Sequence, residues 1–161
     1  MFVESEKVQH IVTVAALFDW TWTEDDLTPV CQALGWEGVV KRYKHIATLR
    51  TDLRAAQSQA YWYTWDQGGI GELIMVVTDK VDSNDIASTE RLREEYEGLV
   101  ARFTTVLGTP YDVQRGPEPE ARWDRKNLVI RLSVLRGYIN LFLVNPAYQE
   151  WIDTPEDLQT Y

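Results

Sequence analysis

Cysteine and histidine are scarce in this chain of 161 residues, which contains one cysteine, Cys31, and two histidines, His10 and His45. A single cysteine excludes an intrachain disulfide and a metal site built from cysteines. Neither histidine lies beside a serine or cysteine in a recognisable catalytic motif. We therefore interpret both histidines as structural or surface residues and expect no catalytic site.

Long apolar runs and a positive net charge are also missing. No apolar stretch approaches the roughly 18 residues of a membrane span, and residues 1–25 lack the basic start and apolar run of a signal peptide. The formal net charge of -9 argues against a nucleic-acid-binding protein, which usually carries a basic surface. We expect a cytoplasmic protein that binds neither nucleic acid nor membrane. Its acidity suits a basic protein partner, or serves solubility alone.

Ion-binding loops are not recognisable either. The acidic segment 79–85 has neither the alternate acids nor the glycine of a calcium loop. The glycine-rich segment 68–71 lies between two predicted strands, whereas a phosphate-binding loop connects a strand to a helix. We therefore expect no metal and no cofactor.

The length favours one globular domain over residues 1–161, with a frayed acidic tail at about 153–161. Its central feature is residues 79–108, an acidic turn followed by a long amphipathic helix with Ser88 or Thr89 as the N-cap. Gly108 and Pro110 end this helix. Its apolar residues are spaced by three and four, which places them on one face: Leu92, Tyr96, Leu99, Val100, Phe103 and Leu107.

The other elements flank this helix. Helices are predicted over 5–18 and from Thr23–Asp26 to Gly35, and a single helical turn over 145–151. Residues 66–69 are predicted as a turn and 109–120 as an irregular crossing loop. Strands are predicted over 38–50, 58–65, 71–78, 122–134 and 138–144. The order α-α-β-β-β-α-β-β predicts an α+β fold with an antiparallel sheet and the long helix packed on one sheet face.

Two clusters could have more than a structural role. Glu24, Asp25 and Asp26 are typical of a helix start, but they could also form paired carboxylates or an exposed protein-binding face. The aromatic residues of the chain either pack in the core or form a binding hot spot within an acidic rim. The residues concerned are Trp20, Trp22, Tyr61, Trp62, Tyr63 and Trp65.

A set of packing and turn residues suggests a family. Trp20 and Trp22 precede an acidic helix that ends in Leu34-Gly35-Trp36; later come Leu107-Gly108-Thr109-Pro110, Gly116-Pro117, Arg122-Trp123 and two apolar strands. This pattern resembles small actinobacterial proteins of unknown function that look like immunity proteins of polymorphic or secreted toxin systems. The resemblance implies a cytosolic antidote that binds a toxin domain and blocks its active site. An acidic surface complements the positive clefts of toxins that attack nucleic acids or nucleotides.

The sequence thus predicts a non-enzymatic immunity protein that occludes a basic toxin domain. The predicted partner-binding residues are Trp20, Trp22, Glu24, Asp25, Asp26, Trp62, Asp79, Asp82 and Asp85. One alternative is a chaperone for a secreted substrate, which would hold an unfolded segment in an exposed sheet face or groove. The other is an enzyme, which would need a concave pocket with a carboxylate of strongly raised pKa.

Overall fold

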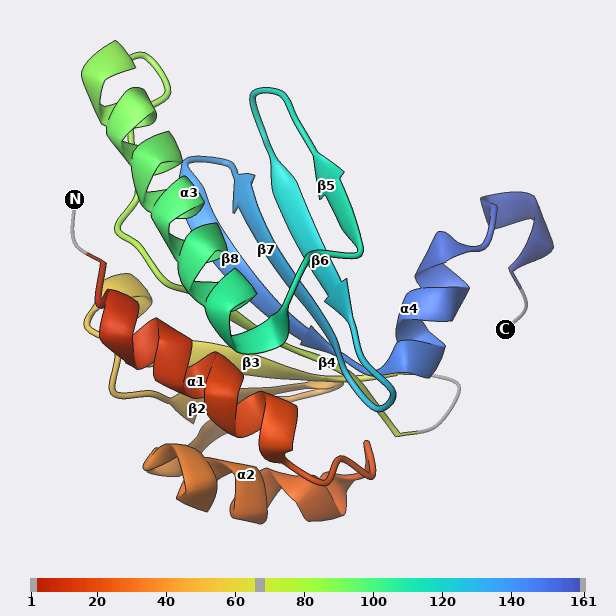
Figure 1. The fold of residues 1–161 in the computed structure, drawn as a ribbon. Helices are drawn as coiled ribbons and strands as arrows, with labels where there is room; N and C mark the ends of the chain where they lie inside the picture. The colour runs from red at the N-terminus through yellow and green to blue at the C-terminus, as the bar shows by residue number, and fades with distance from the viewer. Residues whose placement is uncertain (1–2, 66–68, 160–161) are drawn as a thin grey trace.

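An eight-stranded antiparallel sheet forms the centre of the molecule (Figure 1). The computed structural model describes residues 3–65 and 69–159. The strand order is β1-β2-β3-β4-β8-β7-β6-β5, so two runs of neighbouring strands meet where β4 pairs with β8. The strands are β1 Gly38–Tyr43, β2 Ile46–Arg50, β3 Gln59–Thr64, β4 Ile70–Val76, β5 Asp112–Gln114, β6 Glu120–Asp124, β7 Val129–Leu135 and β8 Tyr138–Val144.

Three helices cover one face of this sheet: α1 (Ser5–Leu17), α2 (Leu27–Leu34) and the long α3 (Ile86–Leu107). Helix α3 packs on β7 and β8, and α1 packs against both α2 and α3. The predicted α+β class, the antiparallel sheet and the long helix on one sheet face are confirmed.

Helix α4 (Pro146–Asp153) lies on the opposite face. Trp123 of β6 contacts Phe103 of α3, with ring centroids 5.5 Å apart, so Trp123 points toward the helices. Its neighbour Arg122 must point the other way, and Arg122 bonds to Asp153 of α4 at 2.9 Å. Residues 145–151 were predicted to form one helical turn, and the helix continues two residues further.

The core is a layer between the sheet and the three helices. Strand register places one continuous row of side chains on the helix side, and most of its members are fully buried. The row runs Trp123, Ile130, Leu143, Leu73, Trp62, Ala47. Because side chains alternate between the faces, the adjacent row lies on the second face: Arg122, Arg131, Phe142, Ile74, Tyr61, Thr48, Lys41.

Two segments predicted as single strands are hairpins. Residues 38–50 form β1 and β2 around a turn at Lys44 and His45, where Lys44 has φ 52 without being glycine. A register shift between Val39 and Lys41 also breaks the period-two pattern of this segment. Residues 122–134 likewise divide into β6 and β7, with exposed polar residues at 125–127 and the buried Leu128 between them.

The predicted crossing loop 109–120 contains the short strand β5, which pairs with β6. Its prolines flank the strand, so they remove none of its central N–H groups. The predicted turn at 66–69 lies largely outside the described residues.

Helix α3 begins one turn earlier than predicted. Asp85 is its N-cap: one carboxylate oxygen accepts the Ser88 N–H at 3.2 Å and the other accepts the Ser88 hydroxyl at 2.8 Å. These bonds hold the pKa of Asp85 below its usual value. Ser88 therefore donates to the cap and is not itself the cap. The 22 residues of α3 span about 33 Å.

Two glycines provide a matched test of backbone conformation. Gly137 has φ +82, and a Cβ added there would lie 2.5 Å from the carbonyl oxygen of Val81. Gly137→Ala should therefore lower the free energy of unfolding by about 1–3 kcal/mol. Gly98, within α3, has open space around its Cα, so Gly98→Ala should raise that energy by about 0.5–1 kcal/mol. Urea unfolding followed by tryptophan fluorescence measures both, and shifts of the same sign would contradict these backbone conformations.

Candidate functional site

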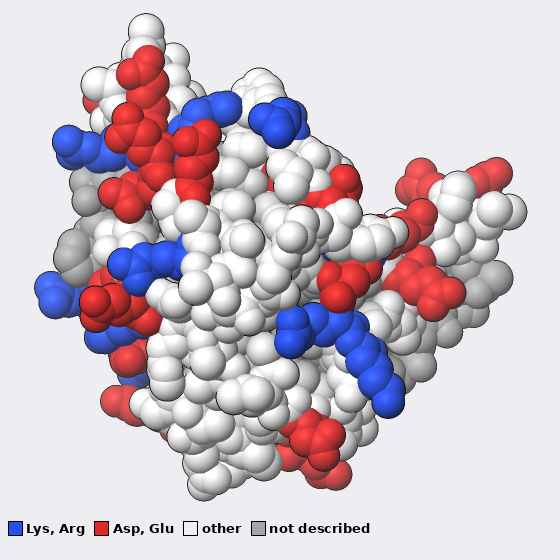
Figure 2. Space-filling view, viewed as in Figure 1, with Lys and Arg blue, Asp and Glu red and all other residues white. Residues whose placement is uncertain are grey.

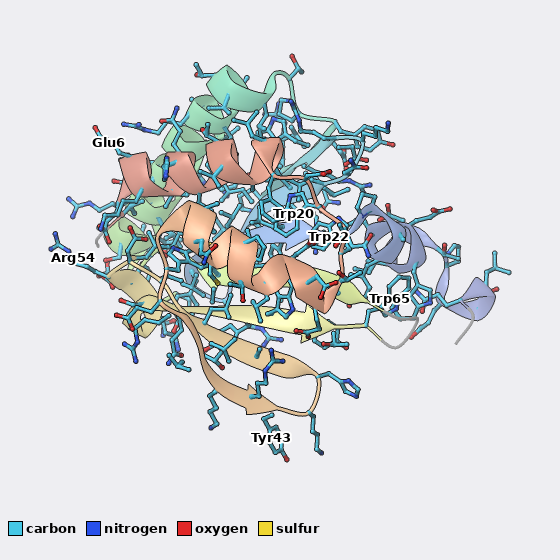
Figure 3. The ribbon with its side chains drawn as sticks, turned by 90° about the horizontal axis from the view of Figure 1, so that it is seen from below. Glu6, Trp20, Trp22, Tyr43, Arg54 and Trp65 are labelled. Carbon is cyan, nitrogen blue, oxygen red and sulfur yellow. The ribbon has the colours of Figure 1, made fainter. Side chains whose placement is uncertain are left out.

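The predicted aromatic anchors are core residues. Trp62 is 0% exposed, Trp20 6% and Trp22 7%. Trp20 and Trp22 stack with ring centroids 4.4 Å apart, between the helices and the sheet (Figure 3). Their indole nitrogens donate to the carbonyl oxygens of Ala15 and Asn127, each at 2.8 Å. The prediction that these three residues anchor a partner is therefore wrong, because burial leaves almost no side-chain surface for the contact.

Asp26 is buried as well. It is 4% exposed and accepts hydrogen bonds from the Trp22 N–H at 2.7 Å and the Thr21 hydroxyl at 2.7 Å. These bonds hold Trp22 in a left-handed conformation with φ 57. Asp26 thus organises the entry to α2 and was wrongly assigned to a surface contact.

The remaining predicted acids are exposed but lie in two separate places. Glu24 pairs with Arg42 of β1 at 3.3 Å. The preceding Trp22 accepts the Ile70 N–H, at the start of β4. The other predicted acids follow the end of β4, whose seven residues span about 23 Å. Glu24 and Asp25 therefore do not share a surface with Asp79, Asp82 and Asp85.

An acidic surface extends from the loop after β4 along the first half of α3. Figure 2 shows acidic side chains gathered over one end of this helix. Clefts of about 320 Å³ and 620 Å³ open beside the loop. Asp82 and Lys80 line both clefts, with Arg91 in the smaller and Arg136 in the larger. We use the term acidic surface for the exposed residues Asp79, Asp82, Asp85, Glu90, Glu94 and Glu97.

A polar cluster on the second sheet face was not predicted. Arg131 lies over the ring of Phe142, 4.4 Å from its centroid, and pairs with Glu120 at 3.2 Å and Glu72 at 3.6 Å. Burial raises the pKa of the Glu72 carboxyl, and the positive charge of Arg131 opposes this shift. The sequence signal for this cluster was the presence of Glu72 and Arg131 within the otherwise mostly apolar strands β4 and β7.

Helix α4 closes one end of this cluster. Tyr148 packs beside Tyr63 and Trp65, with centroids 6.0 Å and 5.3 Å away. Burial, followed by the nearby charge of Glu72, raises the pKa of Tyr148 to about 12. Asp153 pairs with Arg122 at 2.9 Å. These contacts fasten α4 to the sheet.

The cluster therefore has a clear structural role. The enzymatic alternative required a carboxylate of strongly raised pKa in a concave pocket. Burial raises the pKa of Glu72, but Glu72 is only 9% exposed, and the clefts that Asp82 lines do not include it.

Within residues 3–65 and 69–159, no three His, Cys, Asp or Glu side chains are arranged to hold a metal ion. No helix in this part of the chain combines the length and apolar character needed to cross a bilayer.

Comparison with known proteins places the chain in a family. Residues 6–145 match a family of unknown function, DUF6301. The chain belongs to this family. Its description assigns no activity, and it does not bear on the predicted resemblance to immunity proteins.

The chain is similar to a DUF4309 family protein, YjgB, from Bacillus subtilis subsp. subtilis str. 168. The two share 14% identity with a TM-score of 0.44, over 88% of this chain and 97% of that one. No curated protein matches the sequence.

The buried Glu72 generates a pH-dependent prediction. Because its pKa is raised in the folded state, its contribution to stability is complete below the unfolded pKa and is lost as pH rises through the folded pKa. Glu72→Gln removes this titration. The free energy of unfolding of the variant, relative to the unsubstituted protein, should therefore increase with pH just above 4.5 and then level off. Urea unfolding at a series of pH values measures this difference, and parallel pH profiles would contradict it.

Proposed function

We propose that this protein is a cytoplasmic immunity protein that binds a basic toxin effector domain and blocks its active site without catalysing a reaction. The acidic surface is the observation that carries the proposal. It adjoins open clefts, and its carboxylates are exposed in a chain with a formal net charge of -9. The resemblance to immunity proteins inferred from the sequence supports the same function.

The position of the acidic surface on α3 supports specific binding. Leu92, Tyr96, Leu99 and Phe103 anchor the helix in the core. Its outer carboxylates are therefore held on a rigid element, and Glu90, Glu94 and Glu97 lie within about 11 Å along the axis. A fixed array of negative charge steers a positively charged partner and sets its orientation. Toxins that bind phosphate groups have positive clefts of the kind that such an array would occupy.

The chaperone alternative is favoured by a different observation. Strand β1 is at one end of the sheet, and its apolar side chains Val39, Val40 and Tyr43 are 40%, 45% and 65% exposed. An extended segment of a secreted substrate could pair with such an edge. The two functions therefore use different surfaces, and substitutions can separate them.

The partner is first identified by pull-down from native lysate followed by mass spectrometry. The proposal expects one dominant toxin-like protein whose complex weakens as salt is added. A secretion substrate held through an unfolded segment would support the chaperone alternative instead.

Neutralising the acidic surface tests the contact itself. Combining Asp82→Asn, Glu90→Gln and Glu94→Gln should weaken toxin binding about tenfold or more, mainly by slowing association at low salt. Asp85 is kept because it caps α3. The control combines Glu24→Gln and Asp25→Asn, at the other end of β4, and should leave affinity unchanged. Surface plasmon resonance at two ionic strengths measures both, and equal losses in both variants would refute the proposed contact.

A further inference from the structure

Strand β1 has an open edge at the end of the sheet. It pairs with β2 on one side, and no described strand pairs with its other side. Five of its six residues are exposed, including Val39, Val40 and Tyr43. Figure 3 shows Tyr43 pointing away from the body of the molecule. Unpaired backbone groups beside exposed apolar side chains are typical of a site where a strand can be added.

The charge of this edge is opposite to that of the whole protein. Residues 38–51 contain Lys41, Arg42, Lys44 and Arg50 but no aspartate or glutamate. Arg42 pairs with Glu24, and Arg50 with Glu37 at 3.5 Å. Lys41 and Lys44 make no ion pair with the described residues. The Lys44 ammonium lies over the ring of Tyr43, 5.3 Å from its centroid. Two ammonium groups without a carboxylate partner among the described residues therefore flank the edge.

A cleft of about 390 Å³ lies beside the edge, between β1 and α2. Val39 and Arg42 line it from the strand, and Leu27, Cys31 and Trp36 line it from the helix side. Arg42 pairs in register with the buried Ala47, which places it on the helix face of the sheet. By alternation, Lys41 and Tyr43 lie on the second face. An added strand would thus present alternate side chains to the cleft and to Lys41.

We infer that β1 binds an extended acidic segment of a partner protein by strand addition, with an apolar side chain in the β1–α2 cleft and carboxylates beside Lys41 and Lys44. The positive charge of this edge favours an acidic segment as the added strand. Two copies of β1 pairing with each other would bring their lysines and arginines together, which is unfavourable.

This inference goes beyond the immunity function and does not depend on it; it adds the charge and the anchoring cleft for a segment bound at the edge that the chaperone alternative also uses. Strand β1 is four strands from β8, on which α3 packs, and is therefore about 19 Å away across the sheet. The two surfaces also have opposite charges. Substitutions at one are therefore not expected to change binding at the other.

A labelled peptide tests the inference directly. The probe is a fluorescein-labelled peptide of about ten residues with alternating Glu and Val, a length that covers a strand edge, and the matched control peptide alternates Lys and Val. Fluorescence anisotropy should show saturable binding of the Glu-Val peptide and none of the Lys-Val peptide. Amide chemical-shift changes should be concentrated in residues 38–43 and around the β1–α2 cleft.

Charge reversal provides the matched variants. Lys41→Glu should weaken binding of the Glu-Val peptide about fivefold or more. Lys126→Glu, an equal charge change in the exposed turn between β6 and β7, should alter it less than about twofold. The acidic-surface variant should bind the peptide normally, which separates this result from failure of the toxin proposal. Equal effects of both lysine variants, no peptide binding, or dimerisation through β1 in gel filtration would overturn the inference.

Discussion

The pairing of β4 with β8 is the contact on which the rest of the structure depends. It joins strands far apart in the chain through register pairs such as Leu73 with Leu143 and Met75 with Leu141, all fully buried. The loop between these strands contains α3, β5, β6 and β7, so closing it costs conformational entropy that burial of apolar side chains must offset. Once the two strands pair, the sheet presents a continuous apolar surface, and α3 and α1 are held against it. Both proposed binding surfaces therefore depend on this pairing.

The two faces of the sheet are covered by different kinds of side chains. The helix face is a layer of apolar and tryptophan side chains, where alternation places Trp62 and Trp123 on the same row. On the second face α4 packs at one end, and Arg131 lies over Phe142 and pairs with Glu72 and Glu120, which covers apolar surface with paired charge. Arg131 pairs with both carboxylates of this cluster. The two proposed binding surfaces lie elsewhere, with exposed carboxylates on α3 and exposed lysines at β1.

Local patterns predicted the elements whose residues obey one periodicity. Helix α3 and strand β8 were recognised because their apolar residues repeat at 3.6 and at 2 residues. The hairpin at 38–50 was missed because it lacks a strong turn signal: Lys44 adopts positive φ without being glycine or asparagine. The hairpin at 122–134 had a signal, the polar run at 124–127. The N-cap of α3 was missed because Asp85, Ser88 and Thr89 are all good caps in isolation. Of the predicted site, Asp79, Asp82 and Asp85 lie on the proposed acidic surface, whereas the aromatic residues do not.

The amino-acid sequence by itself determined the α+β class, the amphipathic face of α3 and the division between acidic and basic segments. These follow from steric periodicity and from charges that belong to neighbouring residues. Only the tertiary structure decided that Trp62 is buried while Tyr61 is 40% exposed, or that Asp26 is buried beside the exposed Asp25. The exposure of a side chain depends on which distant element packs against its face, and this is set by long-range strand pairing and helix packing.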